Sequence, residues 1–81
     1  MNTVLTPVSL PDFLAGPLAA THRCVSTPQE NVRAMVVPGG FTISESMISG
    51  LPNLEIISVF GVGYDGVPLS ACQARGIRVT N

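Results

Sequence analysis

Residues 54–60, which read LEIISVF, constrain the fold more than any other stretch, because they form a nearly unbroken apolar run rich in β-branched side chains. Such runs are typical of strands in a parallel sheet that is covered on both faces. Three glycines follow at once in G-x-G-x-x-G spacing: Gly61, Gly63 and Gly66. A helix is predicted behind them over residues 67–75, because Pro68 suits a first helical turn and Gly76 a helix end. Together these features predict a strand, loop and helix unit of an α/β sheet.

The rest of the chain repeats this alternation. Short strands are predicted over residues 3–8, 22–26, 32–37 and 77–80. A short or bent helix is predicted within residues 9–21, with Ser9 as its N-cap, and a second one ending at Ile48, capped by Thr42 or Ser44. Residues 27–31 leave no room for a helix. The pattern favours an α/β fold with a parallel sheet.

Composition limits the possible partners. A chain of 81 residues supports one small domain, and 46% apolar with 11% charged residues predicts a globular chain with apolar surface to cover. A net charge of −1 without a basic block favours neither a nucleic-acid nor a membrane-surface partner. No apolar run is long enough to span a membrane, and no signal peptide is visible. Cys24 and Cys72 lack metal-type spacing, so two buried, reduced thiols and a cytoplasmic location are expected.

The glycine loop admits three interpretations. A dinucleotide site requires a carboxylate about 20 residues beyond the glycines, but the next strand ends in Thr80 and Asn81. Tyr64 and Asp65 between the glycines are also bulky and charged, which disfavours that interpretation. Bare backbone N–H groups at the carboxyl end of a parallel strand suit a small carboxylate instead. A tight turn without a ligand is the third possibility.

Residues 51–81, LPNLEIISVFGVGYDGVPLSACQARGIRVTN, resemble the NAD(P)-dependent D-2-hydroxyacid dehydrogenases, in particular their glyoxylate/hydroxypyruvate reductase branch. The family pattern runs L-P-x-L-x-x-I, then G-x-G-Y-D-x-V-D-L, then R-G-I-x-V-x-N, and this chain departs from it at Pro68, where the family has Asp. Residues 1–50 share only the strand and helix rhythm. The resemblance implies a flavodoxin-like, three-layer parallel sheet of order 2-1-3-4-5. Residues 1–81 would then be the N-terminal part of a substrate-binding domain, truncated and without the Rossmann domain.

The resemblance also implies where a substrate would bind. The loop of Gly61, Val62 and Gly63 would hold the substrate carboxylate through the backbone amides of Val62 and Gly63. The turn after the third predicted strand would edge the same pocket, through Gly39, Gly40 and Phe41. No catalytic or cofactor-binding residue is expected in this chain, because the family's catalytic Arg, Glu and His follow the matched segment. His22 is interpreted as structural, and Asp65 as a residue that orders the loop.

The resemblance implies a longer enzyme that contains this segment and reduces a small 2-oxoacid of the glyoxylate or hydroxypyruvate type with NADH or NADPH. The chain alone is expected to be inactive. The alternative is a stand-alone α/β module without a ligand that associates with itself. A homodimer is expected in either case, with an apolar interface involving Leu14, Leu18, Met47 and Ile48. Arg75 is expected to be solvated.

Overall fold

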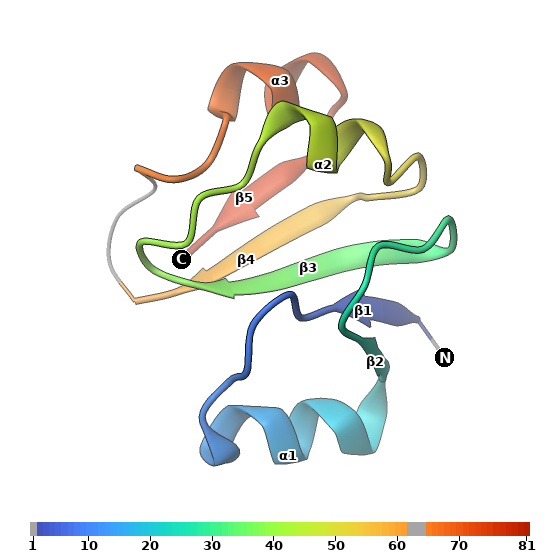
Figure 1. Ribbon diagram of the computed structural model, residues 1–81, viewed down its shortest axis with the longest axis vertical. Helices are drawn as coiled ribbons and strands as arrows, with labels where there is room; N and C mark the ends of the chain where they lie inside the picture. Colours follow the sequence, from blue (N-terminus) through green and yellow to red (C-terminus); the bar gives the residue numbers. More distant parts are fainter. Residues whose placement is uncertain (1, 62–64) are drawn as a thin grey trace.

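The computed structural model describes residues 2–61 and 65–81, which form a five-stranded parallel sheet in the order β2-β1-β3-β4-β5 (Figure 1). In chain order the elements are β1 (Thr3–Leu5), α1 (Asp12–Thr21), β2 (Arg23–Val25), β3 (Val32–Pro38), α2 (Glu45–Ser49), β4 (Ile56–Phe60), α3 (Leu69–Ala74) and β5 (Arg78–Thr80). This topology confirms the predicted flavodoxin-like order. None of the helices in the described part of the chain combines the length and apolar character needed to cross a bilayer.

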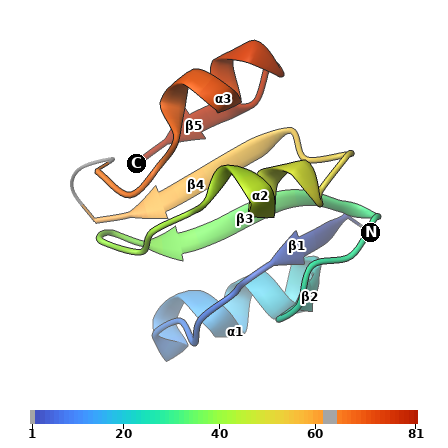
Figure 2. The same cartoon turned by 45° about the horizontal axis from the view of Figure 1, so that its top comes forward.

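The helices lie on the two faces of the sheet. Helices α2 and α3 lie together over the part of the sheet made by β3, β4 and β5, whereas α1 lies at the other end, beside β1 and β2 (Figure 2). Parallel strands are joined by right-handed crossovers. From β1 the chain steps to β2 at one edge of the sheet, whereas from β3 it steps through β4 to β5 at the other edge. With the same handedness, these opposite steps place α1 on the face opposite to α2 and α3. The expected three-layer arrangement follows.

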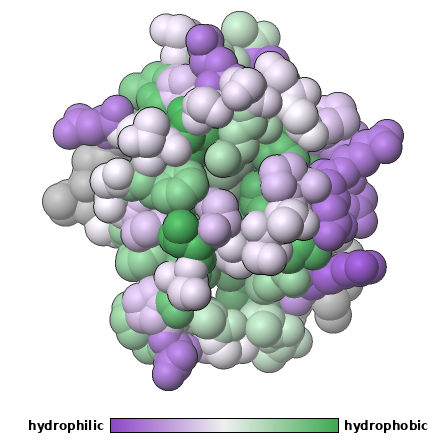
Figure 3. Space-filling view, viewed as in Figure 1, coloured by the Kyte–Doolittle hydropathy of each residue, from purple (hydrophilic) through white to green (hydrophobic). Residues whose placement is uncertain are grey.

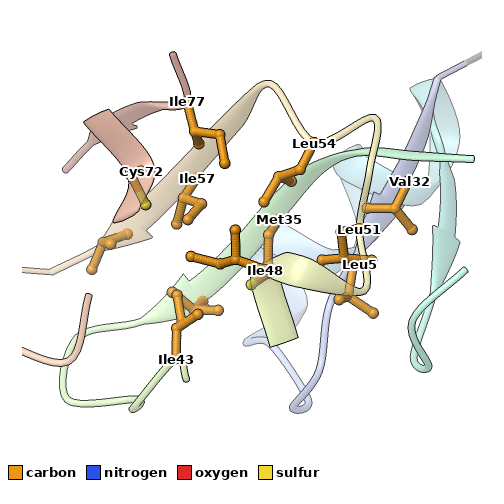
Figure 4. Packing of buried hydrophobic residues seen from close by; sticks show 12 residues of the cluster. Leu5, Val32, Met35, Ile43, Ile48, Leu51, Leu54, Ile57, Cys72 and Ile77 are labelled. Carbon is orange, nitrogen blue, oxygen red and sulfur yellow. The ribbon is translucent and has the colours of Figure 1, made fainter. Parts of the chain in front are cut away.

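The core lies under α2 and α3. In Figure 4, Ile48 from α2 and Cys72 from α3 point toward Met35 and Ile57 of the sheet, and all four are almost fully buried. The buried cluster consists of Leu5, Val32, Met35, Val37, Ile43, Ile48, Leu51, Leu54, Ile57, Val59, Cys72 and Ile77. The prediction that Ile48 contributes to a dimer interface is therefore wrong, because its side chain is part of this core.

The prediction that residues 54–60 are covered on both faces is also wrong. In β4, Ile57 and Val59 are buried, while the alternating Ile56, Ser58 and Phe60 are half-exposed. The physical reason lies in α1, which contains no buried residue and sits at the far end of the sheet. One face of the sheet is thus packed and the other only partly covered.

Several element ends differ from those predicted. Strand β1 ends at Leu5 rather than at residue 8. Pro7, in the stretch that follows, has no N–H to donate to a neighbouring strand. Ser9 is not an N-cap, because α1 begins only at Asp12, and the carbonyl of Pro11 accepts from the first turn. Of the two candidates for the cap of α2, Ser44 is the one used: its side chain accepts from the Met47 amide at 3.1 Å.

Two side-chain predictions are corrected as well. Cys72 is buried as expected, but Cys24 is exposed, because it lies on the short edge strand β2. Arg75 is not simply solvated: its guanidinium donates to the carbonyls of Ile48 and Leu51, at 2.6 and 2.8 Å. It therefore ties the end of α3 to the end of α2.

Candidate functional site

The candidate site lies at the carboxyl edge of the sheet, where β3 and β4 end side by side. Pro38 of β3 pairs with Phe60 of β4, so the loops that follow these strands start from neighbouring positions. In parallel sheets, ligands bind beyond the carboxyl ends of the strands, at the point where neighbouring connections leave toward opposite faces. Here that point lies between β1, which leads to α1, and β3, which leads to α2, so the loop after β3 borders both this point and the loop after β4.

Backbone hydrogen bonds join the two loops. The Gly39 amide donates to the Phe60 carbonyl at 2.9 Å, and further along the Ile43 amide donates to the Gly66 carbonyl at 2.8 Å. The Phe41 amide closes a turn onto the Pro38 carbonyl at 3.2 Å. Because the Gly39 and Phe41 amides already have acceptors, these residues can form a wall of the site but do not offer those amides to a ligand.

Two of the predicted site residues have backbone conformations that favour glycine. Gly40 has φ +87° and Gly61 has φ +113°, both in the left-handed region. The structure brings Gly61 close to the other loop, since a Cβ built on Gly61 would lie 3.7 Å from the Gly39 nitrogen. Four predicted site residues thus gather at one edge: Gly39, Gly40, Phe41 and Gly61. The other two, Val62 and Gly63, lie outside the described residues.

The charge distribution leaves this edge without a cation. Arg23, Arg33 and Arg78 stand at or near the beginnings of their strands, at the amino edge of the sheet, and Arg75 is held at the ends of α2 and α3. In Figure 3 much hydrophilic colour gathers at the right, where β3 and β4 begin in the view of Figure 1. Since these are all the cationic side chains of the chain, an anion at the carboxyl edge must rely on backbone amides.

The pKa shifts among the charged groups also belong to the amino edge. Arg33 and Glu55 form an exposed ion pair between β3 and the residue before β4. The hydrogen bond from Arg33 lowers the pKa of the Glu55 carboxyl and raises the pKa of the Arg33 guanidinium. Neither group lies near the glycine loop, so this pair is a surface feature with no part in the candidate site.

The described residues around the glycine loop do not match the pattern of a nicotinamide dinucleotide site. In a dinucleotide fingerprint the third glycine lets the helix pack closely on the strand, whereas Gly66 lies against the other loop, where a Cβ on it would be 2.1 Å from the Phe41 carbonyl oxygen. The following helix has only six residues, and β5, with Arg78, Val79 and Thr80, carries no carboxylate for a ribose. The residues present therefore do not support a cofactor at this loop.

The remaining candidates carry less chemistry. The His22 ring nitrogen Nδ1 lies 2.8 Å from the Thr21 hydroxyl, at the end of α1 and away from the glycine loop. Asp65 is exposed beside the loop. A cavity of about 500 Å³ lies between α1 and the ends of β1 and β2; its lining includes Thr6, Ser9, Asp12, Leu18, Cys24 and Ser26.

Two contacts between distant parts of the chain were missed by sequence reasoning. Nothing in the local sequence of Arg75 indicates that it reaches Ile48 and Leu51, which precede it by 27 and 24 residues. Gly66 was considered only as part of a ligand loop, whereas the structure places it against the backbone of Phe41. For Gly66, the sequence shows that a side chain is absent, but it does not show that the reason is a contact with the other loop.

The family of the chain follows from comparison with known proteins. Residues 19–81 match the family model described as the D-isomer specific 2-hydroxyacid dehydrogenase, catalytic domain. The chain belongs to this family. The match begins well before residue 51, so the similarity extends further into the N-terminal part than the motifs indicate.

Individual relatives agree with this assignment. The chain is 44% identical over 57 residues to glyoxylate/hydroxypyruvate reductase A of Arabidopsis thaliana, which covers 70% of this chain and 18% of the relative. The solved 2-hydroxyacid dehydrogenase of Ketogulonicigenium vulgare Y25 superposes with a TM-score of 0.91 at 35% identity, over 99% of this chain and 29% of that one. The NADPH-dependent glyoxylate/hydroxypyruvate reductase of Sinorhizobium meliloti, solved with citrate, gives 0.86 at 28% identity, over 100% of this chain and 28% of that one. The chain therefore spans less than a third of these proteins.

Proposed function

We propose that the chain is the N-terminal part of the substrate-binding domain of an NAD(P)H-dependent reductase that converts a small 2-oxoacid into a 2-hydroxyacid. Its family membership supports the oxidoreductase class, and the names of the similar reductases support glyoxylate or hydroxypyruvate as the substrate type. The observation that carries the site is the juxtaposition of the loops after β3 and β4, joined by the Gly39 to Phe60 hydrogen bond. The full-length protein that contains this segment is called the parent enzyme below.

In this proposal the chain binds and orients the substrate carboxylate. Backbone amides of Val62 and Gly63 donate to the carboxylate oxygens, as charge-assisted hydrogen bonds. Gly39, Gly40 and Phe41 form the facing wall. NADH or NADPH supplies the hydride in the parent enzyme, and the loop of this chain does not hold it. An orienting cation must also come from elsewhere, because the four arginines lie away from this edge.

The substitution Gly63→Val in the parent enzyme tests the site. A branched side chain beside the donating amide crowds the carboxylate, so the KM for glyoxylate should rise at least about tenfold, the loss of a hydrogen bond to a charged group. The Kd for NADPH should stay unchanged. Gly16→Ala is a suitable control, because a Cβ on Gly16 meets nothing within 4 Å. A comparable loss of NADPH binding in Gly63→Val would return the loop to a cofactor role and refute the proposal.

The 81-residue chain alone should not catalyse the reduction of a 2-oxoacid. Its single histidine, His22, is bonded to Thr21 and lies beside α1, away from the glycine loop. With the purified chain, glyoxylate or hydroxypyruvate should therefore cause no loss of NADPH absorbance above a heat-treated control. Turnover above that control would show that the chain carries catalytic groups that this proposal denies it.

We also propose that the chain self-associates through apolar surface, with a second copy as the partner. Phe13 of α1 is 79% exposed and Leu69 of α3 is 49% exposed, while Leu14, Leu18 and Met47 are half-buried. Surface of this kind, together with a sheet face that is only partly covered, favours a symmetric dimer. Light scattering over a dilution series tests this: a dimer mass is expected, and a folded monomer at high micromolar concentration would refute it.

A further inference from the structure

The third glycine of the G-x-G-x-x-G spacing is not explained by the proposed carboxylate site. Gly40, Gly61 and Gly76 have positive φ angles, but Gly66 does not, so its conformation alone does not require glycine. Gly66 lies five residues beyond Gly61, in the turn that leads to α3. Its role must therefore come from its surroundings.

The surroundings of Gly66 are the backbone of the other loop. A Cβ at Gly66 would lie 2.1 Å from the Phe41 oxygen, 2.9 Å from the Phe41 carbonyl carbon and 3.1 Å from the Thr42 Cα. These are backbone atoms, which cannot rotate aside as a side chain can. The same contact is closed by the hydrogen bond from the Ile43 amide to the Gly66 carbonyl, at 2.8 Å. The two loops therefore touch main chain to main chain at Gly66.

Among the described residues, two backbone hydrogen bonds fasten the loops together, and the bond from Ile43 to Gly66 is the second of them. The first is the hydrogen bond from the Gly39 amide to the Phe60 carbonyl, where β3 and β4 end. The segment from Gly39 to Ile43 is thus held against the segment from Phe60 to Gly66 at both of its ends. Along the chain, Val62 and Gly63, which are proposed to donate to the carboxylate, fall between Phe60 and Gly66.

We propose that Gly66 is a positioning residue that sets the separation between the two loops and thereby the width of the carboxylate site. This inference rests on the proposed function. Moving a Cβ from 2.1 Å to the 3.4 Å of an ordinary contact requires the loops to part by 1.3 Å. A misplacement of about 1 Å in a binding site costs up to about 100-fold in catalysis. Any side chain at position 66 should therefore weaken substrate use without touching the substrate.

The test compares Gly66→Ala with Gly50→Ala in the parent enzyme. Gly50 is the matched control, since a Cβ there would lie 3.6 Å from the Met47 oxygen, an ordinary contact. Gly66→Ala should raise the KM for glyoxylate about 10- to 100-fold, and leave the Kd for NADPH within about twofold. It should also speed hydrogen exchange at the Ile43 amide but not at the Ile57 amide in the core. An unchanged KM, or a KM that rises equally in both variants, would overturn the inference.

A second measurement needs no variant and applies even if Gly66→Ala does not fold. Oxalate serves as the carboxylate probe for the unsubstituted parent enzyme. A ligand held between the loops stabilises the state in which they are fastened, so saturating oxalate should slow exchange of the Ile43 amide while Ile57 is unaffected. Unchanged exchange at Ile43 under saturating oxalate would refute the positioning role.

The two proposals can fail separately. If Gly63→Val leaves the KM for glyoxylate unchanged, the carboxylate site itself is wrong, and with it the inference about Gly66. If Gly63→Val raises that KM and Gly66→Ala does not, the site stands and only the positioning role of Gly66 is refuted.

Discussion

Arg75 offers the sharpest test of how the packed face of the sheet is held together. Its Nη1 donates to the Ile48 carbonyl at 2.6 Å and its Nη2 to the Leu51 carbonyl at 2.8 Å. Ile48 lies in the last turn of α2, where the carbonyls carry partial negative charge that a cation stabilises. The guanidinium thereby connects the C-terminal ends of two helices that lie on the same face. Arg75→Ala removes both hydrogen bonds and this charge.

The size of the effect follows from the partners that remain. Each carbonyl keeps one backbone donor, because the Leu51 amide donates to Ile48 and the Leu54 amide donates to Leu51. No carbonyl is left without a partner, so the cost is that of two charge-assisted hydrogen bonds on a partly exposed side chain, about 2 kcal/mol in total. A domain of this size has a free energy of unfolding of about 4–12 kcal/mol. The melting temperature should therefore fall by about 8–16 °C.

Thermal and urea unfolding of the 81-residue chain measure this directly. Arg75→Lys retains the charge but reaches one carbonyl, so it should lose about half as much stability as Arg75→Ala. Arg23→Ala is the matched control, because no side-chain partner of Arg23 is found among the described residues, and it should be nearly neutral. If Arg75→Ala unfolds at the same temperature as Arg23→Ala, the two hydrogen bonds contribute nothing and the reasoning is refuted.

Three further predictions concern stability and thiol chemistry. Ser44→Ala removes the N-cap of α2 and should cost about 1 kcal/mol in urea unfolding, while Ser46→Ala, two residues further on in the first turn of α2, should cost less. Burial raises the pKa of the Cys72 thiol above its ordinary value of 9.0, so the folded chain keeps this proton longer than the unfolded chain. The contribution of the Cys72 thiol to the free energy of unfolding should be fully present below about pH 9 and be lost as the pH rises further. In Cys72→Ala, the free energy of unfolding should therefore decline less above about pH 9. A thiol reagent should label Cys24 at once in the folded chain but Cys72 only on unfolding; equal rates would contradict the burial of Cys72.

The sequence predicts the topology well because the apolar pattern and the turn residues act locally. The alternation of strands and helices, the short connection over residues 27–31 and the cap at Ser44 depend on neighbours a few residues apart. The family motif in residues 51–81 added the strand order, which local patterns do not determine. By contrast, the one-sided burial of β4 depends on where α1 lies in space, and no local pattern contains that information.

The glycine motif shows where local reasoning stops. Gly61 and Gly66 look alike in the sequence, as members of the same G-x-G-x-x-G spacing, yet they are glycine for different reasons. Gly61 adopts φ +113°, a property of its own backbone, whereas Gly66 is required by the Phe41 carbonyl, which lies 25 residues earlier in the chain. A motif read along the chain predicts that its glycines share a ligand. The fold assigns Gly61 to a turn and Gly66 to a contact between loops, so glycines that share a motif do not by that fact share a ligand.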